Sequence, residues 1–429
     1  MKTRFEKVSV IGLGYIGLPV AALLASRGLE VIGVDVNPLA VRAINDGRSH
    51  FSEPDLDTLV QVSVDSGRLR AVTQPEPAEA FIIAVPTPVA QNCAPDLSYV
   101  EAAAASLAPV LNKGNLIILE STSPVGTTEM ISQKLAQLRQ DLTFPSGKGE
   151  EADIRIAYCP ERIIPGNMVA ELVNNDRIIG GLSPASTEAA TALYATFVEG
   201  QLVPTNSRAA EMVKLSENAF RDVNIAFANE LSKICERFGV DVWEVIELAN
   251  HHPRVNILQP GPGVGGHCIA IDPWFIIHAA DGDASLMQAA RQVNDSKPGF
   301  VVDRVLALAG PEDTIACLGL TYKANTDDVR NSPAIEIVES LARKHSGRVL
   351  TVEPNIEGLP QSLSALGVQQ STLSDAVRDA QVIALLVDHR EFCLLHPGML
   401  KGKTLYDTRG IWRKRADILN KFPKLSAAI

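Results

Sequence analysis

Long apolar runs are missing from the sequence, and so is any closely spaced pair of cysteines. No run approaches the roughly 18 to 20 apolar residues that a membrane-spanning helix needs. The six cysteines lie far apart, so neither a disulfide framework nor a zinc site is indicated. The chain begins with charged residues instead of the apolar segment of a secretion signal. These absences predict a cytoplasmic protein with no bound metal and no membrane association.

Positive charge is also scarce. Lys and Arg number 39 against 50 acidic residues, and the formal net charge is −11. Most of the surface should therefore repel nucleic acid, and an anionic partner must bind through local clusters of Lys and Arg. Hydrophobic residues make up 46% of the chain, which predicts a globular protein. A length of 429 residues exceeds what one hydrophobic core supports, so two or three domains are expected.

A glycine motif follows the first apolar run, Val8–Ile11. It reads Gly12-Leu13-Gly14-Tyr15-Ile16-Gly17 and leads into a helical pattern. In such a motif the first glycine permits a tight turn, the second lets a pyrophosphate approach, and the third lets helix and strand pack closely. A second strand pattern ends at Asp35, whose carboxylate can bind a ribose 2′-hydroxyl and would repel a 2′-phosphate. The segment therefore predicts NAD binding, and Asn37 is expected to cap the next helix.

Strand and helix patterns alternate from the glycine motif through Tyr158, which predicts an α/β domain with a parallel sheet. Ligands of such sheets bind beyond the carboxyl ends of the strands. Any one of the polar stretches at these ends could be an ordinary loop, but three at one edge can form the wall of a pocket. They are Pro86-Thr87-Pro88, Glu120 to Gly126, and Cys159-Pro160-Glu161-Arg162.

No Gly or Pro interrupts residues 207–238, which as one helix would be roughly 48 Å long. A helix of this length is expected to link two domains and to pair with a second subunit. Lys214 and Asn218 are four residues apart and should project from one face. They could form a solvated polar stripe. Alternatively, they could supply a proton acceptor and an amide donor to one reacting carbon.

A glycine-rich loop at residues 261–274 contains the thiol of Cys268 and, four residues later, the carboxylate of Asp272. Its glycines, Gly265 among them, let a ligand approach the main chain closely. Taken alone, the loop is more typical of a surface turn with an inert cysteine. Because the same chain also has the dinucleotide motif and the Lys214/Asn218 pair, we interpret Cys268 as a reactive nucleophile.

A second α/β region is predicted after Lys297-Pro298 and a helix to Ala309, without a second glycine motif. Lys323, Arg330 and Arg409 lie near its strand ends, where they could bind phosphates or simply be solvated. The predicted fold is therefore two Rossmann-like, doubly wound parallel-sheet domains, residues 1–206 and 301–429. A helical domain with the long helix and the glycine loop, residues 207–300, joins them.

Together these segments resemble the UDP-glucose/GDP-mannose dehydrogenase family nearly from end to end. The matching segments are Gly12–Gly17, Ser121–Gly126, Cys159–Glu161, Glu211–Asn218, Gly263–Asp272 and Leu320–Arg330. The resemblance implies oxidation of the C6 hydroxymethyl group of a nucleotide sugar to an acid, with two molecules of NAD⁺. Residues 252–260 and His267 look most like the branch that acts on UDP-N-acetyl-D-mannosamine in bacterial surface-polysaccharide synthesis. UDP-N-acetylglucosamine and UDP-glucose are the alternative substrates.

The resemblance also implies roles for individual residues and a homodimer formed through the central helix. Cys268 would form a thiohemiacetal and then a thioester, while Lys214 and Asn218 assist proton removal and stabilise the oxyanion. Asp272 would orient the hydrolytic water, assisted by Thr122 and Glu161. Residues expected to contact NAD are Gly12, Gly14, Tyr15, Ile16, Gly17, Asp35, Pro86, Thr87, Thr122 and Arg330. Those expected to contact the UDP-sugar are Glu161, Arg162, Lys214, Asn218, Arg254, Gly265, Lys323 and Arg409, where Arg254 would act on its own subunit or on a neighbouring one.

Two other functions fit parts of the sequence. A 3-hydroxyacid or 6-phosphogluconate type dehydrogenase also combines a Rossmann domain with a Lys-x-x-x-Asn helix, but it needs neither a nucleophilic cysteine nor residues 311–429. A non-catalytic NAD-binding sensor would need none of Lys214, Asn218 and Cys268. Formation of NADH with any nucleotide sugar would exclude the sensor.

Overall fold

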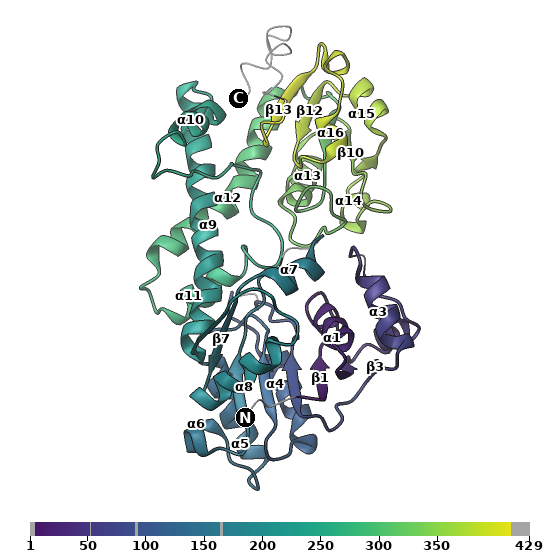
Figure 1. Cartoon of the computed structure of the whole chain (residues 1–429). Coiled ribbons are helices and arrows are strands. Elements are labelled where there is room, and N and C mark those ends of the chain that lie inside the picture. Colours follow the sequence, from purple (N-terminus) through teal and green to yellow (C-terminus); the bar gives the residue numbers. More distant parts are fainter. Residues whose placement is uncertain (1–4, 52, 91–92, 164–165, 413–429) are drawn as a thin grey trace. The chain divides into compact units, whose positions relative to one another are not determined.

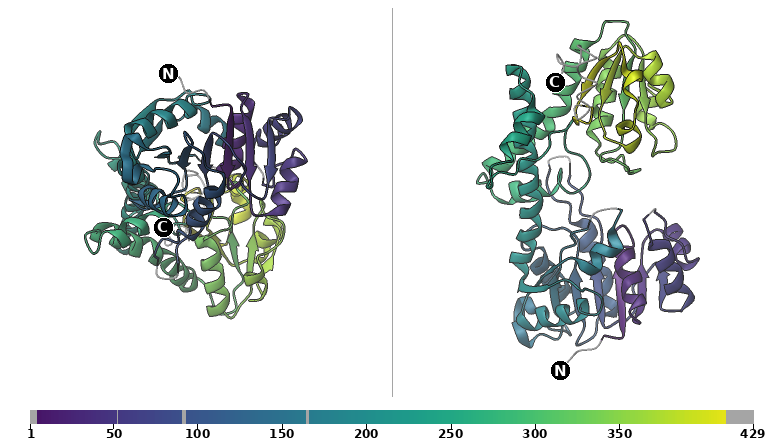
Figure 2. Two further views of the ribbon diagram at one scale, coloured as in Figure 1. Left: turned by 90° about the horizontal axis from the view of Figure 1, so that it is seen from below. Right: turned by 45° about the horizontal axis from the view of Figure 1, so that its top comes forward.

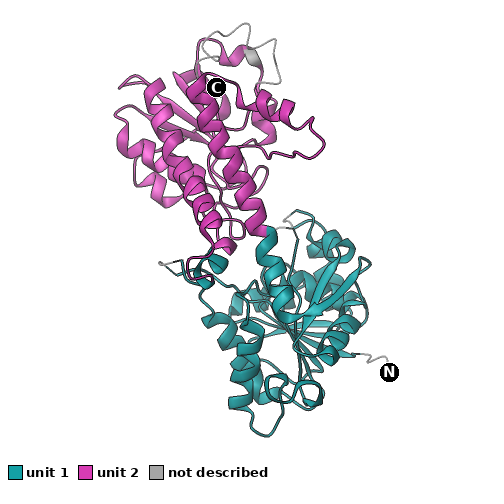
Figure 3. Ribbon diagram, turned by 90° about the vertical axis from the view of Figure 1, so that its left-hand side faces the viewer, with its two compact units in different colours: residues 1–217, 274–279 teal, residues 218–273, 280–429 magenta. Residues whose placement is uncertain are grey.

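The computed structural model describes residues 5–51, 53–90, 93–163 and 166–412. By its internal contacts the chain forms two compact units, residues 1–217 with 274–279 and residues 218–273 with 280–429 (Figure 3). We call them unit 1 and unit 2. The boundary falls inside helix α9 (Ser207–Phe238), which agrees at both ends with the helix expected from the absence of Gly and Pro. The three-domain division at residues 206 and 300 stays a prediction.

Unit 1 is built on an eight-stranded sheet with the order β3-β2-β1-β4-β5-β6-β7-β8 (Figure 1). The first six strands have the doubly wound order of a dinucleotide-binding domain. All neighbouring strands are parallel except β6 and β7, so the predicted parallel sheet has one antiparallel pair. The strands are β1 (Lys7–Ile11), β2 (Glu30–Val34), β3 (Leu69–Val72), β4 (Ala80–Ile83), β5 (Leu116–Leu119), β6 (Arg155–Tyr158), β7 (Arg177–Gly181) and β8 (Leu202–Asn206).

Apolar clusters cover both faces of this sheet, which is why its central strands read as continuous apolar runs. Helices α1 and α8 contribute to one cluster, and α4 and α5 contribute to the other. The α-helices of the unit before α9 are α1 (Gly17–Ser26), α2 (Pro38–Asn45), α3 (Leu56–Asp65), α4 (Ser98–Leu107), α5 (Thr127–Leu138), α6 (Pro145–Lys148), α7 (Met168–Asn174) and α8 (Pro184–Tyr194).

Unit 2 begins with the second part of α9, which lies beside α12 (Ser285–Leu308) (Figure 1). Buried polar side chains join the two helices: Asp222 Oδ1 accepts from Arg291 at 2.6 Å and from Asn294 at 2.8 Å. The short helices are α10 (Val242–Ala249) and α11 (Asp272–Ala279), and α11 continues from unit 2 into unit 1.

The helix expected after Lys297-Pro298 and up to Ala309 is the last part of α12, which continues through Pro298 instead of beginning after it. A proline inside a helix removes one main-chain hydrogen bond and usually bends or ends the helix. Here the polar contacts of Arg291 and Asn294 hold the segment before the proline. Buried Val301, Val302 and Val305 hold the segment after it.

The rest of unit 2 is a five-stranded parallel sheet with the order β11-β10-β9-β12-β13. Apolar clusters pack on both of its faces, and Figure 2 shows this green-to-yellow sheet among its helices. The strands are β9 (Ile315–Leu318), β10 (Val349–Val352), β11 (Gln369–Gln370), β12 (Val382–Leu385) and β13 (Thr404–Asp407). The helices are α13 (Pro333–Lys344), α14 (Gln361–Ser364), α15 (Leu373–Asp379) and α16 (Arg390–Cys393).

Candidate active site

The glycine motif of unit 1 forms the turn between β1 and α1. Gly12 has φ +90°, and a Cβ atom there would lie 2.6 Å from the carbonyl oxygen of Ala84. A Cβ on Gly17 would collide with the carbonyl oxygen of Gly12, whereas a Cβ on Gly14 would meet nothing within 4 Å. Gly12 and Gly17 are therefore required by packing, and the space beside Gly14 leaves the main chain open to a ligand.

Asp35 lies directly after β2 and is held beside this turn. Its carboxylate accepts hydrogen bonds from the main-chain N–H groups of Leu13 at 2.9 Å and Asn37 at 2.8 Å. The Asn37 side chain accepts from the N–H of Leu39 at 3.0 Å, so Asn37 is the helix cap, as expected. Tyr15 stacks on Phe51 with ring centroids 4.4 Å apart.

The loops after β4 and β5 form the neighbouring part of the same sheet edge. Pro86 is exposed, and Thr87 and Thr122 are half-buried. Glu211 of α9 fixes the loop after β5, because its carboxylate accepts from the N–H of Gly126 at 2.7 Å and from the N–H and hydroxyl of Thr128 at 2.8 and 2.6 Å. Glu211 therefore packs the start of α9, three residues before Lys214, against the loop that contains Thr122.

Glu161 lies in the loop after β6 and is almost fully buried, with 7% of its surface exposed. One carboxylate oxygen forms an ion pair with Arg177, and the other accepts from the N–H of Arg162 at 2.6 Å. The Arg162 guanidinium donates to Glu217 at 2.8 Å. These contacts fix the orientation of the Glu161 side chain.

A second buried carboxyl group, Glu120, lies close to this ion pair. The hydroxyl of Tyr194 donates to Glu120 at 2.5 Å, and the Arg177 guanidinium lies 5.5 Å from the Tyr194 ring. Burial raises the pKa of Glu120 to about 7, against the opposing effect of Arg177. Burial also raises the pKa of the Cys159 thiol to about 12, so this cysteine stays protonated and is a poor nucleophile.

The glycine loop in unit 2 packs tightly against residues 320–332. A Cβ on Gly265 would lie 2.6 Å from the carbonyl oxygen of Asn331. Gly266 has φ +81°, and a Cβ there would lie 2.9 Å from the Tyr322 ring. Other residues at these positions would displace the loop that precedes Cys268.

Three of the predicted catalytic residues lie together in unit 2. Cys268 is exposed, and its carbonyl oxygen accepts from the N–H of Asp272 at 2.8 Å. The Asn218 amide donates to the Asp272 carboxylate at 2.5 Å. Lys214 is buried one turn before Asn218 on α9, in the part of the helix that belongs to unit 1. The structure thus connects the end of the glycine loop to the long helix.

The predicted phosphate-binding cations of unit 2 differ in their surroundings. Asp328 accepts two hydrogen bonds from Arg330, at 2.9 and 2.6 Å, so this cation is largely neutralised. Arg409 donates to Asp388 at 2.9 Å. Lys323 is exposed and forms no ion pair with any residue that the structure describes. Arg254 is also exposed.

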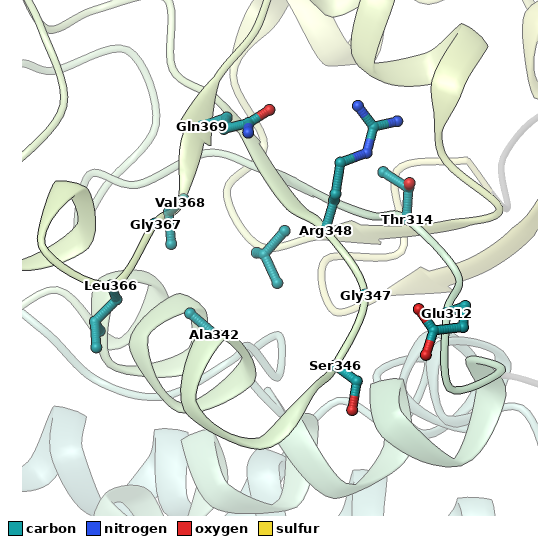
Figure 4. A pocket seen from close by; sticks show the side chains of 11 residues that line it. Glu312, Thr314, Ala342, Ser346, Gly347, Arg348, Leu366, Gly367, Val368 and Gln369 are labelled. Atoms are coloured by element: carbon teal, nitrogen blue, oxygen red, sulfur yellow. The ribbon is translucent and has the colours of Figure 1, made fainter.

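Sequence reasoning placed Glu120 in a polar stretch at a strand end, but it did not identify four other buried polar residues: Arg177, Tyr194, Glu353 and His389. The structure also has a cavity of ≈ 300 Å³ in unit 2, lined by residues such as Glu312, Ser346 and Arg348 (Figure 4). It lies where β9, β10 and β11 begin, at the edge opposite the carboxyl ends of the strands.

Within the described ranges, no group of three potential metal ligands occurs. None of the helices in these ranges has the length and apolar character that a membrane span requires.

Comparison with known proteins matches successive parts of the chain to one family. The NAD binding domain of the UDP-glucose/GDP-mannose dehydrogenase family matches residues 6–198, its central domain matches 208–296, and its UDP binding domain matches 316–414. The chain belongs to this family.

The chain is similar to several members of the family. It is 58% identical over 410 residues to the NDP-N-acetyl-D-galactosaminuronic acid dehydrogenase of Ralstonia nicotianae, with 95% of this chain and 96% of the relative covered. It is 56% identical over 419 residues to the UDP-N-acetyl-D-mannosamine dehydrogenase of Yersinia pestis, with 95% and 100% covered. A solved UDP-D-ManNAc dehydrogenase from Pyrococcus horikoshii matches with a TM-score of 0.86 and 39% identity, covering 94% of this chain and 96% of that one.

Family membership confirms three predictions. The fold is two Rossmann-like α/β sheets with helices between them, the cofactor is NAD, and the protein is an NAD-dependent nucleotide-sugar dehydrogenase. The roles of individual residues stay predictions.

Proposed function

We propose that this enzyme oxidises the C6 hydroxymethyl group of UDP-N-acetyl-D-mannosamine to the carboxylic acid through a thioester on Cys268. The observation that carries the proposal is the arrangement of Asn218, Asp272 and Cys268: the amide is hydrogen bonded to the carboxylate, and the main chain of Asp272 is hydrogen bonded to that of the exposed Cys268. An alcohol oxidation alone would not need the thiol. Oxidation to the acid can use it, because addition of the thiol to the aldehyde gives a thiohemiacetal that can lose a second hydride, and water then supplies the oxygen atom by hydrolysing the thioester.

The first step removes a hydride from C6 to NAD⁺ and a proton from the hydroxyl group. Lys214 is the proposed proton acceptor, directly or through a water molecule. The amide of Asn218 is held by its hydrogen bond to Asp272, so its second N–H can be directed at the oxygen of the reacting carbon. The product of this step is an aldehyde and NADH.

The second step uses the thiolate of Cys268. The sulfur attacks the aldehyde to form a thiohemiacetal, and hydride transfer to a second NAD⁺ gives a thioester. Water then attacks the thioester carbon, which releases the acid and returns the thiol. We assign Asp272 as the group that accepts the proton of this water, with Thr122 and Glu161 assisting. Two NADH are produced for each acid.

The choice of sugar is the part of the proposal that the relatives support least uniformly. One relative is named for UDP-N-acetyl-D-mannosamine and another for an NDP-N-acetyl-D-galactosaminuronic acid. A second candidate substrate is therefore UDP-N-acetylgalactosamine, whose oxidation at C6 would give that acid. Both substrates have an N-acetyl group and use the same chemistry at C6.

The deciding experiment measures NADH release with UDP-N-acetylmannosamine, UDP-N-acetylglucosamine, UDP-N-acetylgalactosamine, UDP-glucose and GDP-mannose. We expect the highest kcat/KM with the first sugar and two NADH per acid. Equal or better turnover of UDP-glucose would contradict the preference for N-acetylhexosamines. A stoichiometry of one NADH per sugar would contradict the thioester.

We also propose that two copies of the chain pair through α9. Phe220, Phe227, Ile234 and Phe238 are 70%, 54%, 46% and 74% exposed. The first three are spaced seven residues apart, so they share one face of the helix. Large exposed apolar side chains in such a row are typical of a surface that another protein covers.

We assign the reaction to the reducing cytoplasm, because a free thiolate is needed at Cys268. We also propose that the product is used in surface-polysaccharide synthesis.

A further inference from the structure

The two α/β sheets share a local arrangement that their sequences do not reveal. In unit 1, Gly12 follows β1 with φ +90°, and Asp35 follows β2 and accepts from the N–H of Leu13. In unit 2, Gly319 follows β9 with φ +95°, and Glu353 follows β10 and accepts from the N–H of Leu320 at 2.7 Å.

The correspondence extends to a main-chain contact of each acid. Asp35 accepts from the N–H of Asn37, and Glu353 accepts from the N–H of Asn355 at 2.9 Å. An acid at the end of a second strand is the usual ribose ligand of a dinucleotide-binding domain. Unit 2 therefore contains the framework of such a site, although it lacks the glycine motif.

The two acids differ in what else contacts them. In unit 2 the acid contacts His389. This histidine is fully buried, and its Nε2 lies 3.0 Å from Glu353 Oε2. Glu353 is itself 5% exposed. Burial alone would raise the pKa of Glu353, but hydrogen bonds from His389 and from the Leu320 N–H lower it on balance. Glu353 is thus an ionised internal acceptor and not a group presented to a ligand.

The hydrogen bonds of His389 determine which ring nitrogen carries the proton. The main-chain N–H of Asn325 donates to Nδ1 at 2.9 Å, and the Asn355 amide approaches the same nitrogen at 2.9 Å. A main-chain N–H can only donate, so Nδ1 is an acceptor. The proton of the neutral ring is therefore on Nε2, where it is shared with Glu353.

Asn325 is attached to the segment of His389 at two points. Its N–H donates to the His389 ring, and its side-chain oxygen accepts from the N–H of Arg390 at 3.0 Å. Asn325 also has φ +58°, which costs a non-glycine residue energy unless its surroundings hold it. The two hydrogen bonds supply that restraint.

The segment that Glu353 and His389 contact, residues 320–326, contains Lys323. The carbonyl oxygen of Lys323 accepts from the hydroxyl of Thr321 at 2.8 Å and from that of Thr326 at 3.0 Å. The N–H of Thr321 donates to Glu353 at 3.2 Å. The main chain of Lys323 is therefore fixed on both sides, while the residue as a whole is exposed.

We propose that His389 and Glu353 are positioning residues that hold residues 320–326 so that Lys323 meets the diphosphate of the nucleotide sugar. This inference rests on the proposed function, since it takes a UDP-sugar as the ligand of unit 2. Neither residue contacts the ligand. Glu353 holds the start of the loop through Leu320 and Thr321, and His389 holds its far end through Asn325. A loop fixed before the ligand arrives loses less conformational entropy on binding.

Two substitutions of His389 separate its two hydrogen bonds. His389→Asn keeps an acceptor close to the position of Nδ1, where Asn325 donates. His389→Gln places its amide nearer Nε2 and keeps only the contact with Glu353. With the full-length enzyme, we expect His389→Gln to weaken UDP binding about tenfold by titration calorimetry and to raise the KM for the sugar similarly. His389→Asn should stay within about threefold of wild type, and the KM for NAD⁺ should be unchanged in both.

A double-mutant cycle tests whether His389 acts through Lys323. In a Lys323→Ala background, His389→Gln should add less than about twofold to the loss of UDP affinity, because the cation that the loop presents is already gone. His345→Ala is the matched control. The Nε2 of His345 lies 2.6 Å from the carbonyl oxygen of Asp313 at the opposite edge of the same sheet, so UDP affinity should not change.

The outcomes separate this inference from the proposed function. Folded His389→Gln enzyme with wild-type affinity for UDP, or fully additive losses in the cycle, would overturn the positioning role. If His389→Gln does not fold, Asn325→Gly carries the test, since glycine tolerates φ +58° but loses the bond from Arg390. It too should weaken UDP binding several-fold, and unchanged affinity would count against the inference. A wild-type enzyme that does not bind UDP would contradict the proposed function itself.

Discussion

The side-chain amide of Asn218 donates a hydrogen bond of 2.5 Å to the carboxylate of Asp272, 54 residues further along the chain. This bond connects the long helix to the end of the glycine loop. It also fixes the orientation of an otherwise rotatable amide, because only its NH₂ group can donate to a carboxylate. In the same turn, the main-chain N–H of Asp272 donates to the carbonyl oxygen of Cys268.

Replacement of Asp272 by Asn should separate formation of the thioester from its hydrolysis. The substitution keeps the size of the side chain but removes the proposed proton acceptor for water. We expect kcat to fall by about 100-fold, which is typical for the loss of a general base. A covalent acyl adduct on Cys268 should accumulate and be visible by intact-protein mass spectrometry. An enzyme that is equally slow but carries no adduct would place Asp272 before the thioester, not after it.

Cys268→Ala should abolish formation of the acid although the dinucleotide turn and Lys214 are unchanged. The first hydride transfer does not need the sulfur, but it is uphill, so little NADH should accumulate. Hydroxylamine, which traps aldehydes, should restore NADH release to one equivalent per sugar instead of two. Cys268→Ser should behave alike, since a hydroxyl is far less ionised near neutral pH than a thiol.

A matched control for this experiment is Cys159→Ala. That thiol is fully buried, and burial raises its pKa to about 12. Its loss should reduce stability by about 1 kcal/mol or slightly more and leave two NADH per acid. Folded Cys268→Ala enzyme that still makes acid near the wild-type rate would refute the proposed mechanism.

Asp35 predicts a strong preference for NAD⁺ over NADP⁺. Its carboxylate is held beside the glycine turn by the N–H groups of Leu13 and Asn37, where it would repel a 2′-phosphate. Asp35→Ser should narrow the ratio of kcat/KM between the two cofactors by about 10-fold or more, mainly through weaker use of NAD⁺. Comparable turnover of NADP⁺ by the wild-type enzyme would show that Asp35 does not exclude the 2′-phosphate.

Structural features that depend on residues close together in the sequence could be predicted from the sequence. The dinucleotide turn was predictable because its glycines lie close together in the sequence, and a Cβ on Gly17 would collide with the carbonyl oxygen of Gly12 in the same turn. Helix α9 was predictable because no residue interrupts its periodicity. By contrast, β7 and β8 were not expected. Strand β7 ends in Gly180 and Gly181, and β8 is largely exposed and contains Pro204, so neither resembles a central strand.

Buried polar partners are the part of the site that the sequence could not reveal. Arg177 and Glu161 are 16 residues apart, and Tyr194 and Glu120 are 74 apart. No periodicity links such residues, because the sheet order brings them together. The same reason explains the missed contact of His389 with Glu353. The sequence indicated which chemistry to expect at the strand ends, but only the fold identifies the residues that hold those groups in place.

The apolar row on α9 predicts that a charge at its centre should prevent pairing of two chains. Phe227 is 54% exposed, so Phe227→Glu should not disturb the core. We expect the wild-type protein to elute as a dimer and the variant as a monomer in size-exclusion chromatography with light scattering. Leu286→Glu, an equally polar change at another exposed apolar residue on α12, is the control and should leave the mass unchanged. A monomeric wild type would contradict the dimer.

Glu120 should give unit 1 a distinctive dependence of stability on pH. Burial raises its pKa from 4.5 to about 7, so the folded protein binds this proton more tightly than the unfolded chain does. The resulting stabilisation is complete below pH 4.5 and is lost as the pH rises through about 7.

Glu120→Gln removes the titration and keeps an acceptor for the Tyr194 hydroxyl. The free energy of unfolding of the variant should therefore increase relative to wild type between pH 4.5 and pH 7.5, by up to about 3 kcal/mol. Chemical denaturation at a series of pH values measures this difference. Glu101→Gln, at a carboxylate that forms an exposed ion pair with Lys134, is the control and should show little change over the same range. A constant difference between Glu120→Gln and wild type would mean that Glu120 is already ionised in the folded protein, stabilised by Arg177.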